Sequence, residues 1–295
     1  MHPEAAPDIR GVIHDIGYRR YDGPRLGRLH GFGTLFLHGL RGVFGLGRTA
    51  KAKVMPFLMV TIMLLPAVVA IAVMALLKEA PLPYQQLSVI MQPVLAIFLA
   101  SQAPVLVALD QRFHVLPLYF SRPGSRMDYV LARYSAMAAA LFLILALPLT
   151  VEFVGELLVD PPGPVHLGAY LSSMAGAVLL AITLGALGLA VAAATHRRGL
   201  GVAAVIAVYL VLTVMSGVLL GVFMATGNDD KAQWANLINP FHLVDAVRAW
   251  AFGHPPGDFA YPDGLAGGLI PLGAMLLVIA ASLGLLAARY RKVGS

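Results

Sequence analysis

Residues 54–77 read VMPFLMVTIMLLPAVVAIAVMALL and contain no charged side chain. Crossing about 30 Å of hydrocarbon takes about 20 helical residues, so this stretch is long enough to span a membrane. Backbone groups in lipid must be paired within the chain, which favours α-helix for a continuous apolar run. Further apolar runs cover residues 88–109, 134–151, 167–195, 201–226 and 265–288. The sequence therefore predicts an all-α integral membrane protein with six transmembrane helices.

The composition supports lipid as the solvent of this chain. Of the 295 residues, 59% are hydrophobic and 12% are charged, whereas soluble domains carry about a quarter charged residues. A chain this apolar cannot cover its surface with polar groups, so we expect it to contact the lipid bilayer. The net charge of +6 does not indicate nucleic acid as a partner, because the basic residues flank the apolar runs.

Lysine and arginine residues predict the orientation of the spans, because cytoplasmic loops are enriched in them. Of the 21 such residues, nine lie in residues 1–53, four in or beside the second connection, two in the fourth connection and three in the tail. Only Lys78, Lys231 and Arg248 fall in the other connections. This pattern predicts a multi-pass protein of the plasma (inner) membrane with its N- and C-termini in the cytoplasm.

The chain is expected to divide into four parts: a cytoplasmic N-terminal segment (residues 1–25), an interfacial helix (26–53), the transmembrane domain (54–290) and a cytoplasmic tail (291–295). The apolar residues of the second part recur near helical spacing opposite a basic face, which suits the inner headgroup region. The six glycines from Gly31 to Gly47 each cost about 1 kcal/mol in a helix. An ordered loop on the membrane is therefore the alternative.

Catalytic and nucleotide-binding motifs are absent from the sequence. It contains no G-x-x-x-x-G-K-[ST], no G-x-S-x-G and no H-E-x-x-H. The nine histidines lack the spacing of metal ligands, and there is no cysteine. We expect a chain that is not an enzyme and that holds no cofactor or metal of its own.

The second connection is the most informative loop. Residues 110–134 read DQRFHVLPLYFSRPGSRMDYVLARY, which interleaves aromatic side chains with arginines. Protein interfaces are enriched in both residue types. One interpretation is a short helix along the membrane that inserts into a groove of a partner protein. The other is an interfacial loop that dips into lipid.

Polar and polarizable residues in the spans are candidates for a substrate path. The candidates are Gln92, Gln102, Tyr209 and Met215. Hydrogen bonds between packed helices are the alternative role for the two glutamines, and lipid contact is the alternative for Tyr209 and Met215.

Two acidic residues, Glu152 and Glu156, lie one helical turn apart near the outer end of the third span. We expect them to reach the outer surface. A cation or an outer arginine such as Arg248 would be their partner in the alternative interpretation. In the long outer segment, residues 227–263, we expect a turn at Asn239-Pro240 and two short helices that dip toward the outer membrane surface.

Three regions of the chain carry motifs shared with one family. They are Asp110-Gln111-Arg112-Phe113, Leu116-Pro117-Leu118 and Ser121-Arg122-Pro123 with Ser125-Arg126 and Tyr129; Asn239-Pro240-Phe241 with Leu243-Val244-Asp245-Ala246 and Arg248; and the N-terminal segment from Ile13 to Arg28. In these motifs and in layout the sequence resembles the ABC-2 type permeases, the membrane subunits of one group of ABC transporters.

The resemblance implies a permease subunit of an ABC exporter that moves a hydrophobic or amphipathic compound outward. ATP and Mg would be bound by a separate ABC ATPase subunit, present in two copies, and the permease would pair with a second copy or a paralogue. Residues 26–53 would form the elbow helix, and residues 227–263 the re-entrant helices that cap the exit. Residues 110–130 would couple to the ATPase, through Asp110, Arg112, Phe113, His114, Leu116, Pro117, Tyr119, Phe120, Arg122 and Arg126.

Two other functions remain open from the residues alone. An ion-coupled secondary transporter would need carboxylates near the bilayer midplane and internal repeats. A non-transporting membrane assembly or regulatory protein would need neither. Co-purification with an ATPase separates the exporter from both alternatives.

Overall fold

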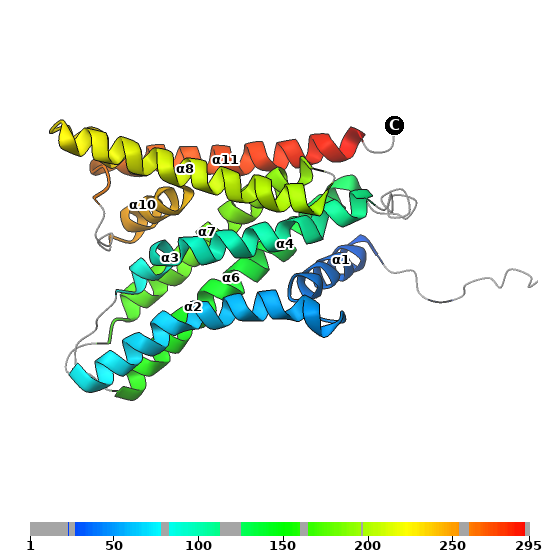
Figure 1. The fold of residues 1–295 in the computed structure, drawn as a ribbon, viewed down its shortest axis with the longest axis horizontal. Helices are drawn as coiled ribbons and strands as arrows, with labels where there is room; N and C mark the ends of the chain where they lie inside the picture. Colours follow the sequence, from blue (N-terminus) through cyan, green and yellow to red (C-terminus); the bar gives the residue numbers. More distant parts are fainter. Residues whose placement is uncertain are drawn as a thin grey trace, which may run out of the picture.

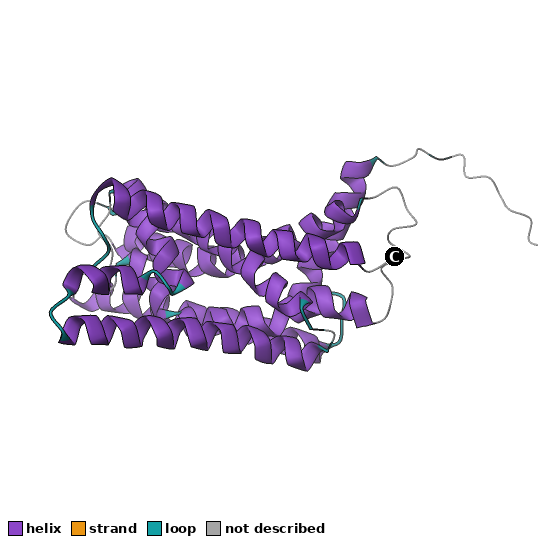
Figure 2. Cartoon of the chain, turned by 90° about the horizontal axis from the view of Figure 1, so that it is seen from above, coloured by secondary structure: helices purple, strands orange, loops and turns teal. Residues whose placement is uncertain are grey.

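A computed structural model gives the fold and describes residue 23 and residues 27–77, 83–112, 125–159, 165–195, 197–253 and 260–292. All regular elements in these ranges are helices (Figure 2). They are α1 (Arg28–Val43), α2 (Ala50–Leu77), η1 (Tyr84–Gln86), α3 (Leu87–Ile90), α4 (Gln92–Arg112), α6 (Arg126–Val159), α7 (Leu167–Ala193), α8 (Arg198–Ala225), α9 (Asp229–Asn236), α10 (Pro240–Phe252) and α11 (Gly264–Lys292).

Five of the described helices, α2, α6, α7, α8 and α11, are long and apolar enough to cross a membrane. The segment Tyr84–Ile90 and the first part of α4 form a pair bent by 55°, which makes six spans if the pair is counted as one. The expected all-α architecture is therefore confirmed for the described residues, with five to six candidate spans.

The helices run between two ends of one bundle (Figure 1). The last turns of α4 and α11 lie at the same end as α1 and the start of α6, which we call the Arg28 end. The opposite end holds α10, the last turn of α6 and the start of α7, and we call it the Glu156 end. An even number of crossings returns a chain to its starting side, so this arrangement fits six spans better than five.

The core of the bundle lies along α4, α6 and α7. Burial follows the inward stripe of α6, where Met137, Ala140, Leu141, Ile144 and Leu145 are all at most 2% exposed. Helices α2, α8 and α11 expose many large apolar side chains instead. Apolar surface on the outer helices is expected of a bundle whose solvent is lipid.

The segment predicted as one interfacial helix over residues 26–53 differs from the structure. Helix α1 ends at Val43, a turn follows, and α2 begins at Ala50. Gly45 and Gly47 adopt φ values of 65° and 81° in this turn, a left-handed conformation that favours glycine. A Cβ atom at Gly45 would also approach the Ala52 carbonyl oxygen to 2.5 Å. These two glycines therefore belong to a turn, where their helix penalty has no effect.

The third span is longer than its apolar run suggested. Helix α6 has 34 residues and starts at Arg126, eight residues before the apolar run. Ser125 and Asp128 cap its first turn: the Asp128 backbone N–H donates to the Ser125 hydroxyl at 3.1 Å, and the Ser125 N–H donates to the Asp128 carboxylate at 2.9 Å. This reciprocal capping box sets the start of the helix.

The two short helices expected between the fifth and sixth spans are present as α9 and α10. The Asn239 side chain accepts a hydrogen bond from the Phe241 N–H at 3.0 Å, and Pro240 occupies the first helical position of α10. Both are favoured residues at a helix N-terminus. Gly253, with φ of 62°, ends α10.

Close packing between α4 and α7 depends on Gly188. A Cβ atom at this position would meet the Leu99 side chain at 2.4 Å, whereas Gly217 on α8 has no neighbour within 4 Å. We expect Gly188→Leu to destabilise the fold by about 1–3 kcal/mol through overpacking. Gly217→Leu is the matched control and should leave the thermal unfolding midpoint of the purified protein unchanged or higher. Equal effects of the two substitutions would contradict this packing argument.

Candidate functional site

The loop predicted to contact a partner connects α4 to α6 at the Arg28 end. Asp110 and Arg112 belong to the last turn of α4, and Arg126 is the first residue of α6. The remaining predicted contact residues, Phe113, His114, Leu116, Pro117, Tyr119, Phe120 and Arg122, lie outside the described residues. The structure therefore describes the two ends of this loop.

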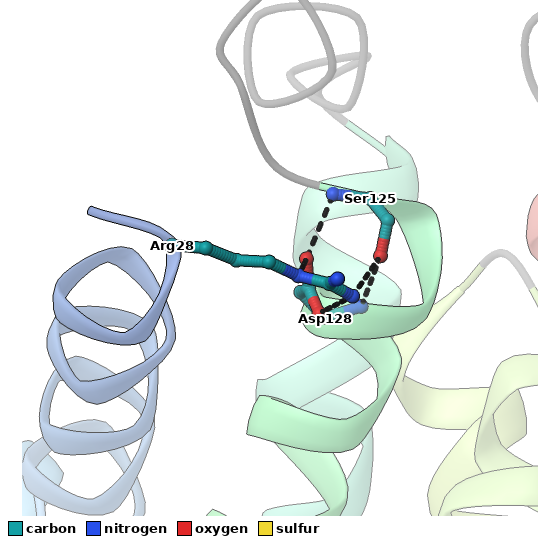
Figure 3. A network of polar contacts seen from close by, with 3 residues as sticks. All are labelled: Arg28, Ser125 and Asp128. Atoms are coloured by element: carbon teal, nitrogen blue, oxygen red, sulfur yellow. Dashed lines mark hydrogen bonds and ion pairs between the residues drawn. The ribbon is translucent and has the colours of Figure 1, made fainter.

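The α6 end of the loop is held to α1 by the Arg28 clamp, which consists of Arg28, Ser125 and Asp128 (Figure 3). The Arg28 guanidinium donates from Nε to one Asp128 carboxylate oxygen at 2.7 Å and from a terminal nitrogen to the other at 2.6 Å. The same terminal nitrogen donates to the Ser125 hydroxyl at 3.2 Å. Bidentate pairing of this kind fixes orientation as well as distance.

The Asp128 carboxylate takes part in two structural interactions. Asp128 caps α6 and also accepts both guanidinium bonds, so the helix start and α1 share one anchor. The hydrogen bond to Asp128 and its negative charge raise the pKa of Arg28, which is charged in any case. The clamp therefore joins the start of α1 to the start of α6 at the end of this loop.

A second contact joins the loop end to the C-terminal helix. Arg126 donates from a terminal guanidinium nitrogen to the Arg291 carbonyl oxygen in the last turn of α11, at 2.9 Å. The last carbonyls of a helix have no partner within it, so a cationic donor is favourable there. Through Arg28 and Arg126, the loop end is tied to both the first and the last described helices.

Sequence reasoning missed the Arg28 clamp, although one signal was present. Ser125-x-x-Asp128 is the spacing of a capping box and marks a helix start. The pairing with Arg28 has no comparable signal, because the two residues are 100 positions apart.

An apolar cavity lies in the middle of the bundle, between α4, α7, α8 and α10. Leu99, Leu184, Tyr209 and Phe241 are among its lining residues, and the Tyr209 and Phe241 rings meet edge to face at 6.1 Å. The space open to the centre of a water molecule is about 30 Å³. This is room for about two waters, so the cavity in this conformation is too small for a larger molecule.

The four residues predicted for a substrate path do not come together. Tyr209 lines the central cavity. The Gln92 side-chain oxygen accepts a hydrogen bond from Asn239 at 2.8 Å, which ties α4 to the start of α10. Gln102 is buried and donates to its neighbour Ser101 at 3.1 Å, and Met215 is 49% exposed on α8.

A buried polar cluster occupies the Glu156 end between α10, α7 and the segment before α11. The Arg248 Nε donates to Asp245 at 2.7 Å, and one terminal nitrogen donates to the Ser172 hydroxyl at 3.1 Å. The Tyr261 hydroxyl donates to the second Asp245 oxygen at 3.0 Å. Gly176 leaves room for the arginine, because a Cβ atom there would meet the Arg248 stem at 2.8 Å.

Burial controls the protonation of this cluster. It raises the pKa of Tyr261, and the Asp245 charge raises it further, so the hydroxyl keeps its proton. Burial lowers the pKa of His242, against the opposing charge of Asp245. Because Tyr261 gives its one hydrogen to Asp245, His242 must donate from Nδ1 to the Tyr261 oxygen, at 3.1 Å. The cluster is thus a directed chain of hydrogen bonds.

A second, smaller cavity adjoins the cluster. Its walls include Tyr84, Ser173, Leu149, Asp245 and Arg248, and about 20 Å³ is open to the centre of a water molecule. One terminal nitrogen of Arg248 and the Ser173 hydroxyl are buried without a hydrogen-bond partner among the described residues. A bound water would satisfy both.

The expectation that Glu152 and Glu156 reach the outer surface is wrong. Glu152 is 0% exposed and Glu156 is 3% exposed. Glu156 accepts hydrogen bonds from the Tyr84 hydroxyl and from the His166 backbone N–H, and its carboxylate contacts His166 Nδ1 at 2.7 Å. The alternative of a pair with Arg248 is also wrong, because Asp245 occupies that arginine. Tertiary packing of α6 against α2 and α7 buries both acids.

Among the described residues, no group of three or more histidine or acidic side chains is placed to hold a metal ion. A family model described as ABC-2 family transporter protein matches residues 62–294. No curated protein matches the chain.

Proposed function

The chain belongs to the ABC-2 family of transporter proteins as a membrane subunit, and we propose that it is the permease of an exporter whose ATP is hydrolysed on separate subunits. In this proposal the chain forms the passage for the cargo, and the partner subunits carry out all phosphate chemistry. It rests on the family membership together with a sequence that carries no phosphate-binding loop.

The Arg28 end is the proposed ATPase-facing side. Two features support this assignment: the excess of lysine and arginine in the predicted inner segments, and the loop of aromatic and arginine residues that joins α4 to α6 there. In this proposal the loop docks in a groove of the ATPase, with Phe113 and Tyr119 as anchors. Asp110, Arg112, Arg122 and Arg126 would supply charge around them.

The Arg28 clamp suggests how docking becomes motion. Closure of two ATPase subunits on ATP would move the loop, and the clamp and the Arg126 contact would carry α1, α6 and α11 with it. Helix α6 is 34 residues long, about 51 Å at 1.5 Å per residue, and it ends beside Tyr84 and His166. One continuous helix would therefore link the ATPase side to the Glu156 end, as a two-state element biased from both sides.

The proposed cargo is hydrophobic or amphipathic. The central cavity supports this because its lining is almost wholly apolar, and Tyr209 offers it a single hydroxyl. A second copy or a paralogue would complete the passage, and α8, whose outward face exposes Leu210, Val214 and Val218, is available for contact with lipid or with that copy. The cargo leaves at the Glu156 end in this proposal.

The family membership is the single observation that carries the proposal, and a biochemical test is direct. The chain should co-purify with an ATP-hydrolysing subunit, and its addition to that subunit in lipid should change the ATPase rate. A chain that binds no ATPase and alters no ATPase rate would leave only the non-transporting and ion-coupled alternatives.

Removal of the Arg28 clamp should weaken coupling more than stability. We expect Arg28→Ala to reduce stimulation of the partner ATPase several-fold with little change in the unfolding midpoint, because the Arg28 side chain is 66% exposed and salt screens its pairing with Asp128. The charge-swapped pair Arg28→Asp with Asp128→Arg should recover part of the stimulation. Full coupling in Arg28→Ala would show that the clamp transmits nothing.

A further inference from the structure

Glu152 is an isolated carboxyl group in the interior of the bundle. Its exposure is 0%, and within the described part of the chain neither carboxyl oxygen has a hydrogen-bond partner. Glu156, one turn further along the same helix, has three such contacts. The two acids therefore share a helix face but differ completely in how their charge is compensated.

Among the residues that the structure describes, none offers Glu152 a positive charge. Leu145, Leu149, Glu152 and Glu156 follow one buried stripe of α6. Helix α2 packs tightly on α6, since a Cβ atom at Gly155 would meet Ile71 at 2.3 Å. The part of α2 that follows Lys53 contains no charged residue.

The titratable groups that face Glu152 are acids, phenols and one engaged imidazole. From its own helix comes Glu156, from η1 comes Tyr84, and from the start of α7 come Tyr170, stacked on Phe153, and His166, which is bound to Glu156. Arg248 pairs with Asp245 and Ser172. Its remaining terminal nitrogen has no partner among the described residues, but Arg248 lines the smaller cavity, to which Glu152 does not contribute. None of these groups can neutralise an ionised Glu152.

An ionised carboxyl group in such a place is strongly disfavoured, because it loses its hydration without gaining a partner. The nearby Glu156 carboxylate adds repulsion. We propose that Glu152 is a proton-binding site, occupied in this conformation, which exchanges its proton only when α6 separates from α2. This inference goes beyond the exporter function and needs no nucleotide partner.

The geometry favours a proton over a larger cation. Glu152 contributes to neither described cavity, although Leu149, less than one turn away, lines the smaller one. A metal ion or an amine needs space beside the carboxylate, whereas a proton needs none. On opening, the neutral acid would release one proton to water on the side that the Glu156 end faces and leave a carboxylate, so low pH on that side would favour the closed bundle.

The test is infrared spectroscopy of the purified full chain at neutral pH. A protonated carboxyl group gives a C=O band distinct from the carboxylate bands. We expect this band in the wild type, its loss in Glu152→Gln and its retention in the matched variant Glu156→Gln. A wild type without the band, or a band that survives Glu152→Gln, would overturn the proposal.

A further variant tests whether Lys78 forms an ion pair with Glu152. Lys78 lies outside the described residues, and an ion pair with it would leave Glu152 ionised. In that case the band would be absent from the wild type and would appear in Lys78→Met, which would also overturn the proposal. A band unchanged by Lys78→Met supports it.

If Glu152→Gln accumulates poorly, the wild type alone suffices in a pH series. The infrared band should persist until the bundle unfolds. Loss of the band at neutral pH in a still-folded protein would contradict an occupied proton site.

Discussion

Replacing Arg248 with alanine is expected to destabilise the folded chain by about 3–5 kcal/mol. The side chain is 3% exposed and holds Asp245 on its own helix and Ser172 on α7. Among the described residues, its removal leaves the Asp245 carboxylate, itself 5% exposed, with the Tyr261 hydroxyl as the one remaining donor. The free energy of unfolding in detergent, measured from the denaturation midpoint, checks this expectation.

Two comparisons make the Arg248 prediction specific. Arg198→Ala removes an exposed arginine from the first turn of α8 and should have little effect. The double variant Asp245→Leu with Arg248→Met removes both charges and should be less destabilised than Arg248→Ala, because no unpaired charge remains. If Arg248→Ala matched Arg198→Ala, the buried cluster would not stabilise the Glu156 end.

The second large effect is expected in the loop between α4 and α6. Phe113→Asp with Tyr119→Asp should abolish stimulation of the partner ATPase while the permease stays folded. Each aromatic anchor of an interface contributes at least about 2 kcal/mol by truncation, and 1.4 kcal/mol corresponds to tenfold in affinity. Loss of both anchors should therefore weaken docking by more than about 100-fold. The ATPase rate of the reconstituted complex is the measurement.

The control for this experiment is an exposed aromatic residue at the other end of the bundle. Phe252, at the end of α10, is 46% exposed, and Phe252→Asp should leave ATPase stimulation near the wild-type level. Normal stimulation in the Phe113 and Tyr119 variant would sink the docking hypothesis and favour a loop that dips into lipid.

Apolar run length predicted the spans well because lipid sets a minimum helix length and forbids unpaired backbone. Turn signals, and not run length, predicted two short helices in the outer segment, and Asn239-Pro240 marked the start of α10. Apolar run length did not predict where the helices begin and end. Gly45 and Gly47 form a turn between α1 and α2, and the periodicity of apolar residues does not reveal this turn. Helix α6 begins at a capping box ahead of its apolar run.

Contacts between residues that are far apart in the chain could not be predicted from the sequence. Arg28 and Asp128 are 100 positions apart in the sequence, and Arg248 and Ser172 are 76 positions apart. The burial of Glu152 depends on how closely α2 approaches Gly155, which is set by packing rather than by any local pattern. An acid near the end of an apolar run ordinarily reaches water, so only the packed bundle distinguishes Glu152 from a surface residue.

The most direct test of a permease driven by another subunit is transport by the purified chain in lipid vesicles. A fluorescent amphipathic dye serves as the probe, with the ATPase subunit and ATP present or omitted. We predict dye movement only when the permease, the ATPase and ATP are all present. Full transport by the permease alone, with no nucleotide-binding subunit in the vesicles, would contradict the account.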